Sequence, residues 1–385
     1  MGSENAVSDK KRSYVYFPNL DGIRAIAALM VVVSHIEYHK NLFNLQRIGI
    51  PNLQNMGKVG VTIFFALSGF LITYLLMVEK GEFNRVGLKD FYIRRILRIW
   101  PLYFLIVIVG FFVYPRGASK EALWLSVFFM PNLAFCLQML PSIFDPIWSI
   151  GTEEQFYIFH PHIFRIKKPE NILYALVGIT LALITINIIV RSIQNHNQFL
   201  SDLSLFLYYA RFHNMMVGAI VAVLYYNTKH PSFKFKLQSA FELMFNKYVQ
   251  IVIWICFILF VYLYTLSEIP QGDIVISVLA ALIIVNLCET SSSIFSLNNS
   301  KLKYCGKISY GIYLLHKYPL YLMLYIAQTY LSSVGLFWQN LFIYVATLIA
   351  VIALASLSYY GFERYFLRFK SRFQKVSQNK QAVSS

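Results

Sequence analysis

Apolar stretches of about 20 residues recur along almost the whole of this 385-residue chain. A helix needs about 20 apolar residues to cross a hydrocarbon core about 30 Å thick, and its backbone hydrogen bonds are then satisfied internally. Charged residues make up only 14% of the chain, against about 25% in an average soluble domain. We therefore predict an all-α, polytopic integral membrane bundle with about ten transmembrane helices. The ten spans are expected near 20–37, 58–78, 100–115, 146–164, 171–190, 203–226, 248–266, 272–289, 308–330 and 338–360.

One further apolar stretch, residues 121–138, is short and contains Pro131 and Asn132. If it does not cross the membrane, 26 of the 34 lysines and arginines fall on one side, and cytoplasmic loops carry such an excess of Lys and Arg. If it does cross, every later loop changes side. We therefore predict that 121–138 is a re-entrant or surface-lying segment and that the N- and C-termini are both cytoplasmic.

This topology divides the chain into a cytoplasmic N-terminal tail at 1–17, a transmembrane domain at 18–362 and a basic cytoplasmic C-terminal tail at 363–385. The net charge of +16 follows from the same bias, and it favours contact with anionic membrane lipids or a polyphosphate ligand on the inner face. Nucleic acid is not expected as a partner, because no soluble basic module is present. The four scattered cysteines have no metal-binding spacing, so no metal is expected.

Arg24 and His35 lie eleven residues apart on the first apolar segment. Eleven helical steps return to within about 20° of the starting direction and rise by about 16 Å, so both side chains share one helix face. Ionisable residues inside a membrane span are costly and mark functional sites by default. The predicted topology places Arg24 at the cytoplasmic end and His35 near the outer end, which indicates a polar path along this face.

A second polar segment, WSIGTEEQFY, begins the fourth expected span and carries Glu153 and Glu154. A carboxylate beside an imidazole fixes its tautomer and stabilises the imidazolium that forms when it takes a proton. Glu153 beside His35 would therefore suit the deprotonation of a hydroxyl group. The alternative is that each side chain makes local hydrogen bonds that hold helices together.

Arg94, Arg95 and Arg98 form a basic cluster just before the third expected span. At spacings of three and four residues they can lie on one side of a helix. Guanidinium groups placed together in this way can bind phosphate oxygens through paired hydrogen bonds. A plain juxtamembrane anchor is the alternative interpretation.

Two more segments combine small or polar residues with apolar ones. The second span contains Ser68, Gly69 and Phe70 in a run of small residues that allows close approach of a backbone or a ligand, although helix packing alone would also explain it. The ninth span carries Ser309, Tyr310, Tyr313 and His316 within about two turns. Arg211 and His213, in the sixth span, are a further pair whose partners the sequence does not identify.

Taken together, these segments resemble acyltransferase family 3, whose membrane-bound members O-acylate cell-surface glycans and some small molecules. Five motifs carry the resemblance, and they occur in order over about residues 18–320. They are NLDGIRAIAALMVVVSH, FFALSGFLI, RILR ahead of Pro101, WSIGTEEQFY and ISYGIYLLH. Where many members read His-Trp-Pro after the last motif, this chain has His316, Lys317, Tyr318 and Pro319.

The resemblance implies acetyl-CoA as the acyl donor, approached from the cytoplasm, and an acceptor hydroxyl at the outer side of what is expected to be a bacterial inner membrane. It implies that Arg24 and His35 are catalytic, with His35 as general base supported by Glu153. The expected donor-binding set is Arg94, Arg95, Arg98, Ser68, Gly69, Phe70, Tyr310 and His316.

Other functions remain open at this stage. Many helices with intramembrane Arg, His and Glu also describe a proton-coupled transporter, although neither inverted repeats nor paired broken helices are evident. A membrane-bound O-acyltransferase of the other large superfamily would not need Arg24 before the histidine. The acceptor could be a lipid-linked saccharide, a surface glycan or a small molecule such as a macrolide, and a homodimer is one option for the assembly.

Overall fold

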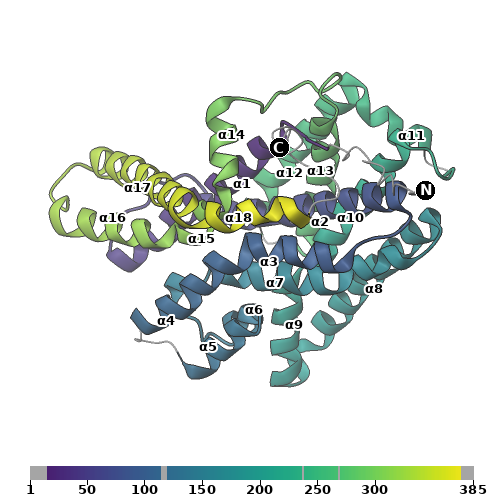
Figure 1. Ribbon diagram of the computed structural model, residues 1–385. Helices are drawn as coiled ribbons and strands as arrows, with labels where there is room; N and C mark the ends of the chain where they lie inside the picture. Colours follow the sequence, from purple (N-terminus) through teal and green to yellow (C-terminus); the bar gives the residue numbers. More distant parts are fainter. Residues whose placement is uncertain (1–14, 114–118, 236–237, 268, 374–385) are drawn as a thin grey trace, which may run out of the picture.

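The computed structural model describes residues 15–113, 119–235, 238–267 and 269–373, and within these ranges all the regular structure is helical (Figure 1). The α-helices are α1 (Leu20–His39), α2 (Met56–Phe83), α3 (Leu88–Phe104), α4 (Gly110–Val113), α5 (Lys120–Val127), α6 (Pro131–Cys136), α7 (Ile147–Phe159), α8 (Pro169–Ile193), α9 (Gln198–Ala210), α10 (Phe212–Lys229), α11 (Gln238–Glu242), α12 (Lys247–Leu266), α13 (Gly272–Cys288), α14 (Ser300–Lys307), α15 (Ser309–Leu315), α16 (Lys317–Tyr330), α17 (Leu336–Ser358) and α18 (Arg364–Lys370). Short 3₁₀ and π segments extend or join them: η1 (Lys40–Phe43), η2 (Leu53–Asn55), η3 (Leu105–Val109), η4 (Ser142–Phe144), η5 (His160–Arg165), η6 (Gln194–His196), η7 (Leu243–Phe245), η8 (Tyr359–Glu363) and η9 (Ser371–Phe373).

The helical class is as predicted, whereas the expected spans are not all single long helices. Within the described residues, six helical segments are long and apolar enough to cross a membrane: Leu53–Phe83, Leu88–Val113, Pro169–His196, Gln198–Lys229, Lys247–Leu266 and Leu336–Phe373. Helix α1 has 20 residues but carries Asp21, Arg24 and Glu37, and α13 is a shorter apolar helix. The fourth and ninth expected spans are built from shorter pieces, α7 with η5 and α15 with α16.

The sixth expected span, 203–226, is divided at Arg211 into α9 and α10. Arg211 has φ 43° and ψ 32°, a left-handed conformation that ends one helix and starts the next. Its buried guanidinium donates to the Tyr208 carbonyl at 3.1 Å and to Thr62 Oγ1 at 3.4 Å, and it lies over the Tyr208 ring. These contacts stabilise a backbone conformation that an apolar side chain would not favour.

The stretch expected to be re-entrant forms two short helices, α5 and α6, joined through Phe129 with φ 57°. At eight and six residues, neither can cross a hydrocarbon core, since eight residues rise only about 12 Å. Helix α6 packs against α7, where the amide of Gln155 donates to the Phe129 carbonyl at 2.7 Å and to Asn132 at 2.9 Å.

The first part of the expected C-terminal tail is helical. Residues 364–373 form α18 and η9, and they pack against α3 (Figure 1). Arg94 Nη1 donates to the carbonyl of Phe373 at 2.6 Å. The N-terminal tail and the rest of the C-terminal tail lie largely outside the described residues.

Helix α2 is the centre of the bundle, because it packs against α1, α10 and α13. Its contact with α10 is a backbone contact: a Cβ atom placed on Gly69 would meet the Met215 carbonyl oxygen at 1.9 Å, and one on Gly218 would meet the Ala66 carbonyl oxygen at 2.0 Å. Small residues allow such close approach between helices in a bilayer, where packing rather than water exclusion drives association.

We expect Gly218→Ala to destabilise the protein by at least about 1–3 kcal/mol, because the added methyl group must push two backbones apart. Gly178→Ala is the matched control, since a Cβ atom at this position of α8 meets nothing within 4 Å. The measurement is the thermal unfolding midpoint of both variants in the same detergent. Equal midpoints would contradict the close α2–α10 contact.

Candidate active site

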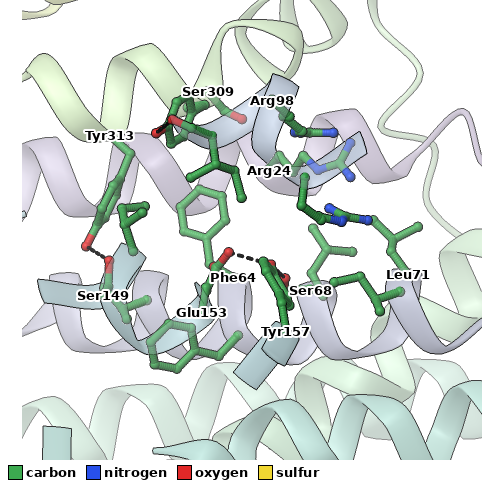
Figure 2. Close-up of a pocket in the computed structure, with 18 residues that line it drawn as sticks. Arg24, Phe64, Ser68, Leu71, Arg98, Ser149, Glu153, Tyr157, Ser309 and Tyr313 are labelled. Carbon is green, nitrogen blue, oxygen red and sulfur yellow. Dashed lines mark hydrogen bonds between the residues drawn. The ribbon is translucent and has the colours of Figure 1, made fainter. Parts of the chain in front are cut away.

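A cavity of about 890 Å³, counting its open mouth, lies between α1, α2, α3, α7 and α15 (Figure 2). It brings together residues that are up to 289 positions apart in the chain. Its lining residues are Arg24, Val61, Phe64, Phe65, Leu67, Ser68, Leu71, Ile72, Arg95, Arg98, Ile99, Ser149, Ile150, Glu153, Tyr157, Ser309, Tyr310 and Tyr313.

Three guanidinium groups line this cavity. Figure 2 shows the side chains of Arg24 and Arg98 on the same side of it, and Arg95 lies over the ring of Tyr157 at 5.3 Å. Arg24 also pairs with Asp21 at 2.7 Å. Arg94 is on another side of α3, where its contacts are with Phe373 and, at 3.5 Å, with Glu79. The expected basic cluster therefore divides, with Arg95 and Arg98 in the cavity and Arg94 holding the C-terminal segment.

Glu153 faces the arginines in this cavity rather than His35, contrary to the expected pairing. Its carboxylate accepts a hydrogen bond from the Tyr157 hydroxyl at 2.6 Å, and that hydroxyl also contacts Ser68 (Figure 2). This hydrogen bond follows from helical spacing, because Tyr157 follows Glu153 by four residues and lies on the same face of α7. The neighbouring Glu154 points toward α3, where it accepts from the Trp100 indole at 2.8 Å.

His35 instead pairs with His316, across 2.6 Å between His35 Nδ1 and His316 Nε2. His316 is fully buried, and its Nδ1 lies 2.7 Å from the carbonyl oxygen of Tyr313. A carbonyl oxygen can only accept, so Nδ1 of His316 must carry a proton. The Nε2 of neutral His316 is then an acceptor, and His35 Nδ1–H must donate to it. Neutral His35 is left with an unprotonated Nε2, the form that a general base requires.

The His35–His316 pair adjoins the cavity through Tyr313. The Tyr313 side chain lines the cavity and shares a hydrogen bond of 2.7 Å with Ser149, while its backbone carbonyl orients His316 (Figure 2). Tyr313 thus connects the polar side chains of the cavity with the His35–His316 pair.

Lys317, at the position that departs from the resembled motif, has a structural partner. Its buried ammonium donates to Asp145 Oδ2 at 2.7 Å and to the Ser142 carbonyl at 2.5 Å. This ion pair links Lys317, which directly follows His316, to Asp145 and the η4 segment. Pairing of this kind offsets the free-energy cost of burying a charge.

The remaining expected donor-binding residues separate into two groups. Ser68 and Tyr310 line the cavity, and the Tyr310 hydroxyl donates to the Ile99 carbonyl at 2.8 Å. Gly69 and Phe70 do not line it, because Gly69 contacts α10 and Phe70 packs in a ring cluster with Phe17. Gly69 and Phe70 were expected to bind the donor together with Ser68, but they point about 100° and 200° away from Ser68 around α2 and so face other helices.

The sequence pattern pointed to Tyr313, beside His316, but not to Lys370, Tyr157 or Ser149. Helix α18 packs against α3 and so brings Lys370 within electrostatic range of four arginines: Arg24, Arg94, Arg95 and Arg98. No local pattern links this lysine to arginines that lie 272 to 346 positions earlier in the chain. Tyr157 could have been found, because it follows Glu153 by one helical turn.

Comparison with known proteins identifies the chain's relatives. The family described as an acyltransferase domain, acyltransferase family 3, matches residues 17–360. The chain is 28% identical to "Putative peptidoglycan O-acetyltransferase YrhL" of Bacillus subtilis, covering 92% of this chain and 55% of that protein. It is 26% identical to "Peptidoglycan O-acetyltransferase OatA" of Listeria monocytogenes, covering 95% of this chain and 59% of that protein. The chain thus spans little more than half the length of these relatives. No solved structure matches.

The tautomer assignment predicts a specific spectroscopic pattern. In protein labelled with ¹⁵N-histidine, at a pH where both imidazoles are neutral, we expect His35 to be protonated at Nδ1 and unprotonated at Nε2, and His316 to be protonated at Nδ1. Imidazole ¹⁵N chemical shifts report this directly, with His35→Gln and His316→Gln variants assigning the signals. A proton on Nε2 of neutral His35 would contradict the hydrogen-bond assignment.

Proposed function

The chain belongs to acyltransferase family 3, and from that premise we propose that it moves an acetyl group from acetyl-CoA to a hydroxyl group of a cell-surface or lipid-linked glycan. Family membership identifies it as an acyltransferase of the membrane rather than a transporter. The donor, the acceptor and the catalytic roles below are the content of the proposal.

The convergence of Arg24, Arg95 and Arg98 on one cavity is the observation that carries the proposal. Glu153 is the only carboxylate among the cavity's described lining residues, so positive charge dominates there. Guanidinium groups bind phosphate oxygens with two parallel hydrogen bonds, and coenzyme A carries three phosphate groups at one end. The cavity therefore suits the phosphate end of acetyl-CoA, with the apolar side chains of α2 beside its pantetheine arm.

The predicted charge distribution supports the direction of transfer. Arg24 lies near the start of α1, and Arg95 and Arg98 lie ahead of the third expected span, on the side assigned to the cytoplasm, where acetyl-CoA is made. His35 lies about 16 Å farther along α1, toward the side where surface glycans are assembled. Donor phosphates would bind at the inner end and the thioester would extend toward the histidines.

In the proposed reaction, His35 Nε2 removes the proton from the acceptor hydroxyl as its oxygen attacks the thioester carbonyl. The tetrahedral intermediate then collapses, the carbon–sulfur bond breaks, and the coenzyme A thiolate takes the proton from His35. His316 Nε2 accepts from His35 Nδ1–H throughout, which holds the ring and stabilises the transient imidazolium. Glu153, with Tyr157, would position the arginines rather than the base.

The nature of the acceptor is inferred from the relatives' names, which specify peptidoglycan. The direct test is to incubate the purified protein with labelled acetyl-CoA and either peptidoglycan fragments or a macrolide, and to locate the label by mass spectrometry. Label on a saccharide hydroxyl supports the proposal. Label only on the macrolide would replace the proposed acceptor class.

We expect His35→Ala to lower kcat for acetyl transfer by about 10²- to 10⁴-fold, because the general base is lost. The KM for acetyl-CoA should change little, since the arginine cluster remains. His196→Ala, in the exposed η6 segment, is the control for a histidine change away from the site. A His35→Ala protein that elutes normally from a sizing column and keeps its activity would refute the role of His35.

We expect Lys370→Met to raise the KM for acetyl-CoA about tenfold with little change in kcat, because one cation near the donor phosphates is lost. Lys301→Met removes an exposed lysine of α14 and should leave the KM unchanged. Initial rates at a series of acetyl-CoA concentrations measure both constants. An unchanged KM in the Lys370 variant would exclude Lys370 from donor binding.

A further inference from the structure

A second, larger hollow lies at the end of the bundle that carries His35. It is an open cleft of about 1280 Å³ between α2, α8, α9, α12 and α13. Amides, hydroxyls and tyrosine rings predominate among the side chains that line it.

The cleft and His35 are at the same end because α1 and α2 are antiparallel. Ser34, next to His35, donates to the carbonyl of Gln54 at 2.5 Å, and Asn55 follows in the cleft wall. On the predicted topology this is the outer face of the membrane. A polar cleft here is open to the compartment that contains the proposed acceptor.

Several polar groups in the cleft have unused hydrogen-bonding capacity. The side chains of Asn187 and Arg191, one turn apart on α8, make no hydrogen bond to another described residue, and neither do the hydroxyls of Tyr208 and Tyr209. Polar side chains within a membrane-spanning helix are costly unless a partner or water satisfies them. Asn187 therefore suggests a ligand or water in the cleft.

The floor of the cleft is a rigid polar network. Asp273 accepts from His213 at 2.9 Å and from Asn214 at 3.0 Å, and a hollow of about 330 Å³ continues from the cleft down to this pair. Arg211, at the break between α9 and α10, lies within electrostatic range of Asp273. This network accounts for the intramembrane pair Arg211 and His213, and it holds the cleft walls in place.

The cleft shares a wall with the cavity of the candidate active site. The Tyr209 ring packs edge-on against Trp148 with ring centres 5.3 Å apart, and the next residue, Ser149, lines that cavity. Trp148 in turn packs edge-on against Phe65, another cavity residue. A molecule in the cleft would lie directly behind this aromatic wall.

We propose that this cleft binds a saccharide chain and is the outer docking site for the glycan acceptor. Sugar rings present apolar C–H faces, which pack on tyrosine rings, and a rim of hydroxyls, which pair with amides and hydroxyls. The cleft offers both kinds of group together. The assignment of its ligand as the acceptor rests on the proposed acetyltransferase function.

A phospholipid headgroup is the competing ligand for a cleft at this depth. Its phosphate would favour a strongly cationic pocket, whereas only three of the eighteen lining residues are charged, namely Lys58, Arg191 and Asp273. The balance of amides and hydroxyls over charges therefore favours a neutral saccharide.

The test measures binding of an N-acetylglucosamine tetramer to the full chain in nanodiscs, by calorimetry. We expect binding to weaken at least tenfold in the Asn187→Ala, Arg191→Ala double variant. Asn171→Ala, an exposed asparagine at the other end of α8, should bind as the unmodified protein does.

A second measurement does not depend on the variants folding. A photoreactive derivative of the tetramer should cross-link to peptides of α8 and α9 in the unmodified protein. Cross-links confined to other segments, or equal affinity in the double variant, would overturn the proposal. Displacement of the tetramer by phosphatidylglycerol at tenfold lower concentration would identify the cleft as a lipid site instead.

These outcomes are separable from the proposed function. A tetramer that binds in the cleft but is never acetylated would refute the acetyl transfer to saccharides and keep the binding site. Acetylation that proceeds with an unchanged KM for saccharide in the double variant would keep the function and refute the cleft.

Discussion

The close backbone contact between α2 and α10 is the interaction on which the rest of the structure depends. Gly69 and Gly218 let the two helices approach until a single added methyl group would overlap a carbonyl oxygen. Because α2 is held so tightly on this side, Ser68 is turned toward α7 and the arginine cavity. The η2 segment that leads into this helix places Asn55 in the wall of the outer cleft. One helix thus separates and positions both polar regions.

Polar groups in this bundle are concentrated rather than scattered. The arginines and Glu153 share one cavity, His35 pairs with His316, Lys317 with Asp145, and His213 with Asp273. Each pairing joins helices that are distant in sequence, so satisfying a buried polar group also fixes helix packing. The proposed chemistry uses groups that the bundle already holds in defined geometry.

Two openings along α2, a cavity against its middle and a cleft at its start, suit an enzyme whose substrates come from opposite sides of a membrane. The cationic cavity matches a phosphate-bearing donor, and the amide- and tyrosine-lined cleft matches an uncharged acceptor. Between them lie Trp148, Ser149 and Tyr313, with the histidine pair beside them. On this view the protein need not move the whole acyl donor across the membrane.

The amino-acid sequence by itself determined the helical membrane class, the shared face of Arg24 and His35, and the grouping of Arg95 with Arg98, since all three follow from the length and period of single helices. Family 3 membership was also evident from five motifs in order. Periodicity did not reveal the break at Arg211, because only its contacts with Tyr208 and Thr62 stabilise the left-handed backbone. Nor could it place Lys370 beside the arginines. Tertiary structure alone decided that His35 pairs with His316 instead of Glu153, because hydrogen bonds between helices depend on which faces pack together, and that choice is made by close contacts elsewhere in the bundle.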